Sequence, residues 1–372
     1  MKNIFRLPFG KSPSGKSRMR TIVTALCTIF AVLAAFALLF SAYGGRVAPL
    51  VWKLPAMATL VLPVVAVAAL VLLAVLAGFK QWPAALVLVG AFCLSWPTLR
   101  LIAPCNIVSV EADTCKTHLK VLTMNVTQFN WADNDTCPSA NMRYILDQDA
   151  DIVVIQEGLV YFSYEHLATV KPMLEELYEK YPYRKKHFFD VGILSKYPFT
   201  EVPSPMPNDS LNYYIKAWDV DAPGGNLRVV GMHLSSLSLT DNDRDIIDKM
   251  NTHSDRKGRI RSVKNKLGAA FVAHAQEAAA MREFIDNTAG DLLIMGDMND
   301  TPGSFTYRTI CGDDVRDAWA DVGFGPMYTY HDHHLYVKID HILYRGGLKP
   351  LACRSDRAGE SDHYPMVATF ER

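Results

Sequence analysis

The feature that most constrains this chain is the stretch from residue 21 to about residue 103, which is rich in Leu, Val and Ala and contains no acidic side chain. A helix of about 20 apolar residues is long enough to cross a bilayer. Residues 21–41 and 56–78 meet this requirement without an interior charge. Residues 82–102 meet it less cleanly because they contain two prolines and Arg100. We therefore predict three transmembrane helices within residues 21–103; a buried core helix or a re-entrant hairpin is the alternative.

Flanking cations predict the orientation of these helices. The tail at residues 1–20 carries six basic residues and no acidic one, which is typical of a cytoplasmic segment. The long first apolar run, followed by more apolar sequence, argues against a cleaved signal peptide. Three crossings would place the rest of the chain in the periplasm or outside a bacterial cell, anchored in the inner (cytoplasmic) membrane. If residues 82–102 do not span, the domain stays in the cytoplasm.

The remaining sequence has the composition of an ordinary soluble domain. We expect a linker at residues 104–117 and one domain at residues 118–372. Lys plus Arg equals Asp plus Glu, at 38 each, so the net charge indicates no particular partner. The region after the apolar stretch has an odd number of cysteines and no CxxC spacing, which argues against a zinc site and leaves any disulfide pairing open: Cys105, Cys115, Cys137, Cys311 and Cys353.

Short apolar runs in this domain alternate irregularly with helical patterns. The runs predict strands at residues 119–126, 151–156, 191–194, 213–220, 227–234, 291–295, 337–344 and 364–370. Helical spacing occurs at residues 141–148, 164–181 and 244–287. Apolar strands separated by helices predict an α/β protein with sheets inside and helices outside. No GxGxxG follows a strand, so no dinucleotide cofactor is expected.

Polar side chains recur at the ends of these apolar strands. Strand ends at one edge of a sheet converge in space, and ligand sites of layered α/β proteins favour such edges. Carboxylates suit Mg²⁺ or Mn²⁺, a histidine beside a carboxylate suits proton transfer, and an amide can donate to phosphate oxygens. The residues in question are Asn125, Glu157, His233, Asp297, Asn299, Asp340, Asp362 and His363. The pattern predicts a metal-assisted site for phosphoester hydrolysis.

Each of these residues also has a purely structural interpretation. Glu157 could be a surface carboxylate, Asp297 a turn residue and Asn125 a cap. His233 could be a satisfied core histidine, and Asp340 a simple hydrogen-bond acceptor. Their recurrence at so many strand ends favours the site.

Several short motifs occur in one order along residues 118–372. They are the strand that ends at Asn125, QE at 156–157, ILSKYP at 193–198, HL at 233–234, GDMND at 296–300, IDHIL at 339–343 and SDH at 361–363. In this ordered set the chain resembles the endonuclease/exonuclease/phosphatase superfamily, which includes pancreatic-type deoxyribonuclease, apurinic endonucleases, neutral sphingomyelinases and inositol polyphosphate 5-phosphatases. The resemblance implies a four-layered α/β sandwich of two packed mixed sheets flanked by helices.

The resemblance also implies a role for each residue. Glu157 would be the main ligand of Mg²⁺ or Mn²⁺, with Asn125 and Asp362 on the metal side. Asp297 would orient or deprotonate the attacking water. The remaining catalytic roles are a phosphate contact by His233, a phosphate-oxygen contact by Asn299, and a catalytic His363 whose tautomer is fixed by Asp340.

Two departures from the family pattern concern the substrate side. The segment before ILS reads Phe-Asp-Val-Gly at residues 189–192, where many members have a small or amide residue with Ala. Lys338 stands where many members have Arg. The family's substrate preferences therefore do not transfer directly.

For two other clusters we favour a structural interpretation over a functional one. His331, His333 and His334 lack a carboxylate partner at metal-ligand spacing, which is typical of a solvated loop. The basic residues within 256–266 could contact nucleic-acid or lipid phosphates, but the absence of interleaved aromatic residues favours a solvated helix face.

The leading hypothesis is a membrane-anchored phosphodiesterase or nuclease that uses Mg²⁺ or Mn²⁺. A phospholipid head-group hydrolase, similar to a sphingomyelinase or an inositol phosphatase, is the alternative within the same chemistry. A non-catalytic binding protein is disfavoured because Glu157 and His363 are both present. A transporter is disfavoured because the apolar spans lack charged residues well inside them.

Overall fold

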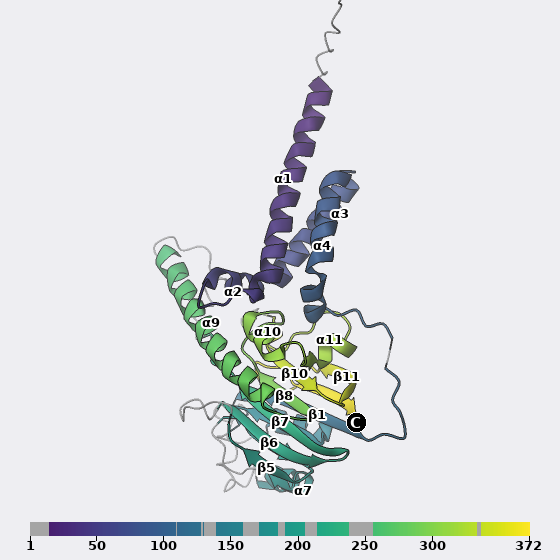
Figure 1. The fold of residues 1–372 in the computed structure, drawn as a ribbon, viewed down its shortest axis with the longest axis vertical. Helices are drawn as coiled ribbons and strands as arrows, with labels where there is room; N and C mark the ends of the chain where they lie inside the picture. The colour runs from purple at the N-terminus through teal and green to yellow at the C-terminus, as the bar shows by residue number, and fades with distance from the viewer. Residues whose placement is uncertain are drawn as a thin grey trace, which may run out of the picture. The chain divides into compact units, whose positions relative to one another are not determined.

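The computed structural model describes residues 15–108, 110–127, 129, 139–158, 171–184, 190–204, 214–237, 256–332 and 336–372 (Figure 1). The chain forms two compact units. One comprises residues 1–41 and 61–96, and the other comprises residues 42–60 and 97–372.

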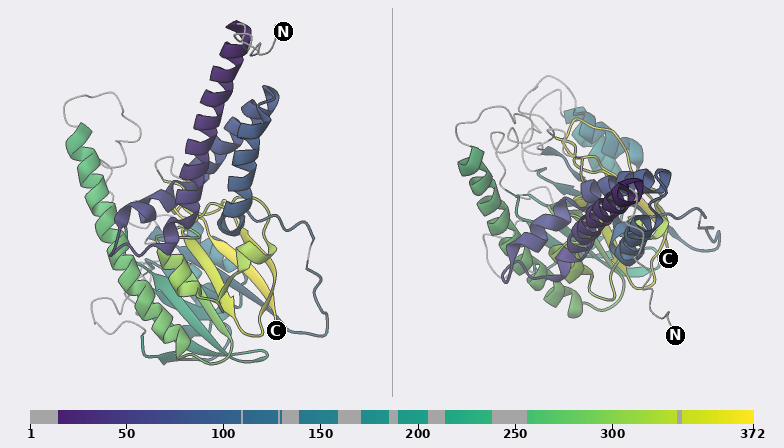
Figure 2. Two further views of the ribbon diagram at one scale, coloured as in Figure 1. Left: turned by 45° about the horizontal axis from the view of Figure 1, so that its top comes forward. Right: turned by 90° about the horizontal axis from the view of Figure 1, so that it is seen from above.

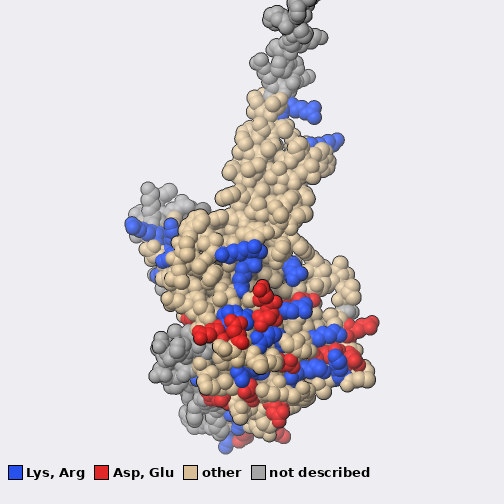
Figure 3. Space-filling model, viewed as in Figure 1, with Lys and Arg blue, Asp and Glu red and all other residues tan. Residues whose placement is uncertain are grey.

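The first unit consists of apolar helices. They are α1 (Gly15–Tyr43), α3 (Leu62–Gly78) and α4 (Trp82–Ile102), and the visible face of this unit is almost uncharged apart from basic side chains near its end (Figure 3). By length and composition, α1 and α4 are each able to cross a membrane. The predicted span at 56–78 is instead divided into α2 (Lys53–Leu60) and α3, which meet at 64°. Pro63 lies in the first turn of α3, where proline is tolerated because its missing N–H would have no helical partner.

The second unit contains two six-stranded sheets. The first has the order β11-β12-β1-β2-β4-β3 and the second has the order β5-β6-β7-β8-β10-β9. Within each sheet one central pair, β1 with β2 and β7 with β8, is parallel, and the other pairs are antiparallel. The strands of the first sheet are β1 (His118–Asn125), β2 (Ile152–Gln156), β3 (Tyr183–Arg184), β4 (Gly192–Ser195), β11 (Lys349–Ser355) and β12 (Met366–Glu371). Those of the second are β5 (Phe199–Val202), β6 (Ile215–Ala222), β7 (Gly225–His233), β8 (Leu292–Asp297), β9 (Arg316–Asp317) and β10 (Asp340–Arg345).

Three apolar clusters explain why the sheets stack. One face of each sheet contributes to a shared core, in which Val121 and Ile152 join Val229 and Leu293. The other face of the first sheet packs against α5 (Ala140–Gln148) and α7 (Lys171–Lys180). The other face of the second sheet packs against α9 (Arg256–Asp286) and α10 (Phe305–Cys311) (Figure 2). A further short helix, α11 (Ala318–Val322), contacts β11. The predicted α/β sandwich of two mixed sheets between helices is confirmed.

Most predicted strands lie where the apolar runs place them. The run at 337–344 is an exception, since β10 begins only at Asp340. Strand β11 was not predicted, because its sequence KPLACRS mixes proline, alanine and three polar residues without a clear alternation. The predicted helices at 164–181 and 244–287 begin in segments outside the described residues, and their described parts are α7 and α9.

The short segment between α1 and α3 belongs to the second unit. It includes a 3-10 turn at Gly44–Arg46 and the helix α2. The hydroxyl of Thr98 donates to the carbonyl of Ala42 at 2.9 Å, and Arg308 of α10 donates to Thr98 at 2.7 Å. Ala42, Thr98 and Arg308 all belong to the second unit, so these two hydrogen bonds lie within it.

Candidate active site

The strand ends of both sheets carry the predicted site residues. Strand β1 ends at Asn125, and Glu157 directly follows β2, its parallel neighbour. Strands β7 and β8, also parallel, end at His233 and Asp297. Strand β10 runs antiparallel to β8 and begins at Asp340, which is in register with Asp297. The strand pairing therefore places these side chains close together at the ends of the strands.

Three residues near these strand ends adopt backbone angles that side chains seldom occupy. Glu157 has φ of 58° and Asn299 has φ of 51°, while Gly296 has φ of 137°. Non-glycine residues with such angles cost free energy and occur where the surrounding structure holds them, often at functional sites. A Cβ on Gly296 would lie 2.0 Å from the carbonyl oxygen of Met232. The Gly in the GDMN motif is thus required by the close approach of β7 to β8.

Asp297 lies at the centre of the cluster and is 1% exposed. Its Oδ2 is 3.6 Å from Nε2 of His363 and 3.7 Å from Nε2 of His233. The amide of Asn125 approaches the same oxygen at 3.5 Å. Its other oxygen accepts the backbone N–H of Asn299 at 2.7 Å. One carboxylate is therefore flanked by two imidazoles on one oxygen and held by the backbone on the other.

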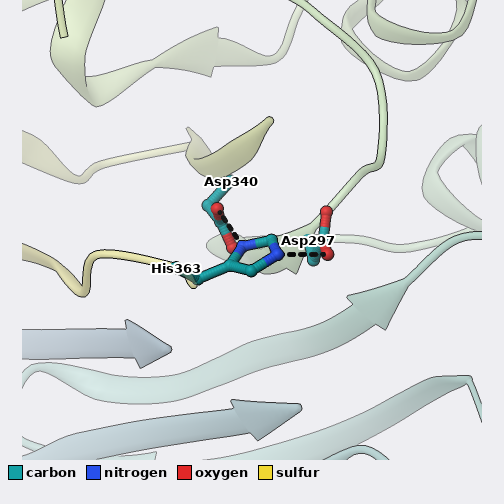
Figure 4. Close-up of side chains that lie close together, drawn as sticks. All are labelled: Asp297, Asp340 and His363. Carbon is teal, nitrogen blue, oxygen red and sulfur yellow. Dashed lines mark hydrogen bonds and ion pairs between the residues drawn. The ribbon is translucent and has the colours of Figure 1, made fainter. Parts of the chain in front are cut away.

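His363 is fixed by a second carboxylate. Its Nδ1 lies 2.9 Å from Oδ2 of Asp340, so the ring has Asp340 on one side and Asp297 on the other (Figure 4). The ring of Tyr330 packs edge-on against it with centroids 5.0 Å apart. Asp340 in turn accepts nothing at its buried Oδ1 from any described residue.

His233 is fixed in the same manner by Asp190. Nδ1 of His233 lies 2.7 Å from Oδ2 of Asp190, and the other oxygen of Asp190 accepts the backbone N–H of Glu157 at 3.1 Å. The sequence reasoning treated residues 189–192 only as a departure from the family and did not assign Asp190 a role. An acidic residue next to a buried strand was the only signal, and the pairing with His233 arises from the tertiary fold.

The surrounding charges shift the pKa of all three central groups. Burial raises the pKa of Asp297 to about 6, although the nearby His363 acts in the opposite direction. Burial lowers the pKa of His363, but the carboxylates of Asp340 and Asp297 outweigh it and raise this pKa to about 10. Burial likewise opposes the raised pKa of about 9 at His233, which the hydrogen bond to Asp190 causes. Both imidazoles are cationic at neutral pH, and Asp297 is a base poised near it.

The predicted metal-side residues form a connected group. The amide of Asn125 donates to Oε1 of Glu157 at 3.0 Å, while its oxygen accepts the N–H of Thr127 at 3.1 Å. Thr127 also donates to Asp362 at 2.6 Å. Asp362 therefore joins the group through Thr127 rather than through Glu157 or Asp297.

Two groups of side chains could hold a hard divalent cation. Asp297, Asp340 and His363 each offer a ligand atom within 4.8 Å of the others, and they are distinct from the predicted metal-side residues Glu157, Asn125 and Asp362. The buried Oδ1 of Asp340 has no partner among the described residues, and the Glu157 side chain is 33% exposed. Oxygen donors with room for water are what Mg²⁺ and Mn²⁺ require.

Asn299 is held at the site by its backbone N–H and by its side chain. Its backbone binds Asp297, and its Nδ2 donates to the carbonyl of Leu234 at 2.9 Å. This second bond joins the loop after β8 to the loop after β7.

Lys338 points away from this chemistry, whereas His331 is hydrogen-bonded to the backbone of Ser361 and Asp362. Lys338 is 4% exposed and points to Asp317 at 3.0 Å and to Nδ1 of His341 at 2.7 Å. His331 stacks on Tyr364 with ring centroids 3.9 Å apart. His333 and His334 lie outside the described residues. In the predicted basic stretch, the side chains at 256, 257 and 259 also lie outside them, and those at 261 and 264 are exposed.

Residues 129–363 match the Endonuclease/Exonuclease/phosphatase family. The chain belongs to this family. The family comprises phosphoester hydrolases, usually metal-dependent, and the chain is assigned to that enzyme class. No curated protein matches the chain.

Solved structures with a similar fold include members with different substrates. A humanized D. rerio TDP2 is 16% identical, with 68% of this chain and 99% of that chain covered and a TM-score of 0.46. Sphingomyelinase C from Streptomyces griseocarneus is 16% identical, with coverage of 68% and 99% and a TM-score of 0.42. ANGEL2, described as a 2′,3′-cyclic phosphatase, is 17% identical, with coverage of 71% and 99% and a TM-score of 0.39.

Proposed function

We propose that this Endonuclease/Exonuclease/phosphatase family member is a membrane-anchored phosphodiesterase of the nuclease type that depends on Mg²⁺ or Mn²⁺. The observation that supports this most is the position of Asp297. The carboxylate of Asp297, whose pKa is raised to about 6, lies between two imidazoles. Each imidazole is held by a carboxylate of its own. Such a group can accept a proton from water while the adjacent cations stabilise charge on phosphate.

In this proposal each site residue has a separate role. Asp297 would orient the attacking water and take its proton. His363, held by Asp340, and His233, held by Asp190, would donate to phosphate oxygens as charge develops. Asn299 would hold a further phosphate oxygen while it ties the two loops together. A bound divalent cation would supply Lewis-acid polarisation of the phosphate, and Glu157 and Asn125, with Asp362 nearby, would hold it.

Substitutions of site residues test the catalytic role of these side chains separately from their role in folding. We expect Asp297→Ala and His363→Ala to abolish hydrolysis of a generic phosphodiester by the full-length protein, while circular dichroism shows a retained fold. Asp147→Ala, on a side chain that is 64% exposed, is the matched control and should be fully active. Excess EDTA should remove activity, and Mg²⁺ or Mn²⁺ should restore it. Full activity of either site variant would refute the mechanism. Full activity of the wild type in excess EDTA would refute it as well.

A second candidate function is hydrolysis of phospholipid head groups. The observation in its favour is that α1 and α4 are long and apolar enough to cross a membrane, which would bring lipid close to the domain. A panel of plasmid DNA, abasic DNA, sphingomyelin and phosphoinositide, assayed with one preparation of enzyme, separates the two. Preference for either lipid would favour this second function.

We further propose that the domain lies on the membrane face opposite the N-terminal tail. Ala42 at the end of α1 accepts a hydrogen bond from Thr98, near the end of α4, at 2.9 Å. These two helix ends must then be on the same side. Because α3 leaves that side and α4 returns to it, this pair of helices does not change the side of the domain. The side therefore depends on the single crossing by α1. On this proposal the side of the domain does not depend on whether the weaker apolar segment at 82–102 spans the membrane.

Cysteine labelling tests this topology. Cys105 and Cys115 are exposed in the described part of the second unit. In spheroplasts, a membrane-impermeant maleimide should label either one when the other cysteines are replaced by serine. A cysteine placed in the tail by Ser12→Cys should react only after lysis. Labelling of the tail cysteine in intact spheroplasts, with protection of Cys105 and Cys115, would reverse the assignment.

A further inference from the structure

A second concave feature lies beside the candidate active site and is not used by the mechanism above. It is a cavity of about 460 Å³, within the range of small-ligand sites. Aromatic and basic side chains dominate the described part of its lining, chiefly Trp319, Tyr328, Tyr336, Arg354, Arg357 and Tyr364.

The register of the first sheet places this cavity next to the reacting centre. Met366, at the start of β12, pairs with Thr123 near the end of β1 and with Ser355 at the end of β11. The ends of β2, β1 and β11 and the start of β12 therefore share one edge, in the order Glu157, Asn125, His363 and then the cavity residues. Neighbouring strands are about 4.8 Å apart. The cavity is thus about one strand beyond His363, on the side away from Glu157.

The segments that form the cavity also contact the site directly. Tyr364 follows His363 in sequence, and its backbone N–H donates to Thr329 at 2.6 Å. The hydroxyl of Thr329 accepts the N–H of Asp340 at 3.0 Å. Tyr328, which lines the cavity, precedes Thr329. A ligand in the cavity would therefore sit on the same loop that positions Asp340 and His363.

The lining presents exposed rings and unpaired donors. Tyr328 and Tyr336 are 39% and 54% exposed and meet edge-on, with centroids 6.0 Å apart. Trp319 is 8% exposed, and its buried indole N–H has no partner among the described residues. Arg354 is held by Asp356 at 3.0 Å, whereas exposed Arg357 has no hydrogen bond or ion pair to any described side chain. Ring faces suit stacking, and donors with free guanidinium charge suit anions and carbonyl oxygens.

We infer that this cavity is a nucleotide subsite, which takes an unstacked base and its phosphate from a single-stranded nucleic acid beside the phosphate that is cut. The inference rests on the proposed phosphodiesterase function and narrows its substrate to nucleic acid. Tyr328 and Tyr336 stack the base, and Arg357 pairs with the flanking phosphate. The Arg357 guanidinium, which has no carboxylate partner among the described residues, repels a quaternary ammonium, so a choline head group is disfavoured.

Binding without turnover tests the subsite separately from catalysis. The full-length protein in detergent is titrated into a fluorescein-labelled single-stranded oligonucleotide in EDTA, and anisotropy gives Kd. A second probe has the same backbone with abasic residues. The variants are Tyr336→Ala and Arg357→Ala. Tyr183→Ala is the control, since this exposed tyrosine (41%) lies in β3 at the other edge of the same sheet.

Stacking of one base predicts a Kd about tenfold higher for Tyr336→Ala on the normal oligonucleotide, with no change on the abasic one. Arg357→Ala should weaken both probes, because it removes a phosphate contact. Tyr183→Ala should bind as the wild type does. Unfolding midpoints check that each variant is folded.

Three results would overturn the subsite. These are unchanged binding in both variants, an equal effect of Tyr336→Ala on the two probes, and displacement of the oligonucleotide by phosphocholine, which would assign the cavity to a lipid head group. Loss of hydrolysis is measured separately with Asp297→Ala on a generic phosphodiester. An inactive wild type that still shows the predicted Kd pattern would refute the proposed catalysis and leave the subsite standing.

Discussion

Lys338→Met is expected to destabilise the domain severely although Lys338 contacts no substrate in the proposed mechanism. Its ammonium lies 3.0 Å from Oδ2 of Asp317, and the two side chains are 2% and 0% exposed. Methionine keeps most of the apolar stem and removes the charge. Oδ2 of Asp317 then retains Tyr307 at 3.3 Å and His341 at 3.4 Å, neither of which is a fixed cation.

The magnitude follows from the burial of the pair. Removing one partner of a buried ion pair costs about 3–5 kcal/mol, because an uncompensated charge remains in a medium of low dielectric constant. For a domain of this size each kcal/mol lowers the unfolding midpoint by about 2–4 °C, so a drop of about 10 °C is expected. Lys349→Met is the control, because Lys349 is 48% exposed and its pair with Glu371 at 3.6 Å contributes less than about 1 kcal/mol.

The pH dependence of the folding stability provides a second test of the buried ion pair. Burial raises the pKa of Asp317, but the charge of Lys338 outweighs it and holds the pKa well below its usual range. A carboxyl whose folded-state pKa is depressed contributes stability above its unfolded pKa of about 3.9 and loses it as the pH falls. The stability gap between wild type and Lys338→Met should therefore shrink on acidification below about pH 4.

Urea denaturation followed by circular dichroism, at pH 7 and at pH 3.5, measures both effects. Adding Asp317→Asn to Lys338→Met should recover part of the loss, since it removes the stranded charge. A loss at pH 7 no larger than that of Lys349→Met, or a gap that widens in acid, would refute the argument.

Two further predictions concern the site itself. Asp190→Asn should lower kcat on a generic phosphodiester by about 100-fold or more while leaving the unfolding midpoint close to that of the wild type, because His233 loses the group that fixes its tautomer and charge; wild-type kcat would show that Asp190 does not position this ring. Gly296→Ala should destabilise the domain by more than about 2 kcal/mol and impair hydrolysis, because its Cβ would meet the Met232 carbonyl oxygen at 2.0 Å. Gly290 also has a positive φ, of 79°, but open space where a Cβ would lie, so Gly290→Ala should lower the free energy of unfolding clearly less in urea denaturation; equal losses would contradict the proposed clash with Met232.

The fold class and most of the site were predictable from local sequence. The runs IVVI and LLIM are apolar throughout, which is typical of strands covered on both faces, and both lie in central strands. Polar residues at their ends had to converge, because parallel neighbours end at the same edge. Strand β11 escaped prediction because it is an edge strand with half-exposed, mixed residues, and its formation depends on the pairing partner β12.

Other features depended on contacts between residues distant in the sequence. The role of Asp190 is set by His233, 43 positions away, and the burial of Lys338 is set by Asp317. Neither partner can be found from spacing, since the sheet order that joins them is decided by packing of whole strands. The tie between Ala42 and Thr98, which bears on the membrane topology, spans 56 positions and has no local signature.

Local sequence was enough to predict the apolar helices, the layered α/β class and the groups proposed to bind a metal and transfer a proton. These properties follow from periodicity and side-chain chemistry, which act over a few residues. Tertiary structure alone decided that Asp297 lies between two carboxylate-held imidazoles, and that a cavity of tyrosine and arginine side chains adjoins His363. Burial and proximity are collective properties of the packed sheets, and they are what shift the pKa of Asp297 to about 6.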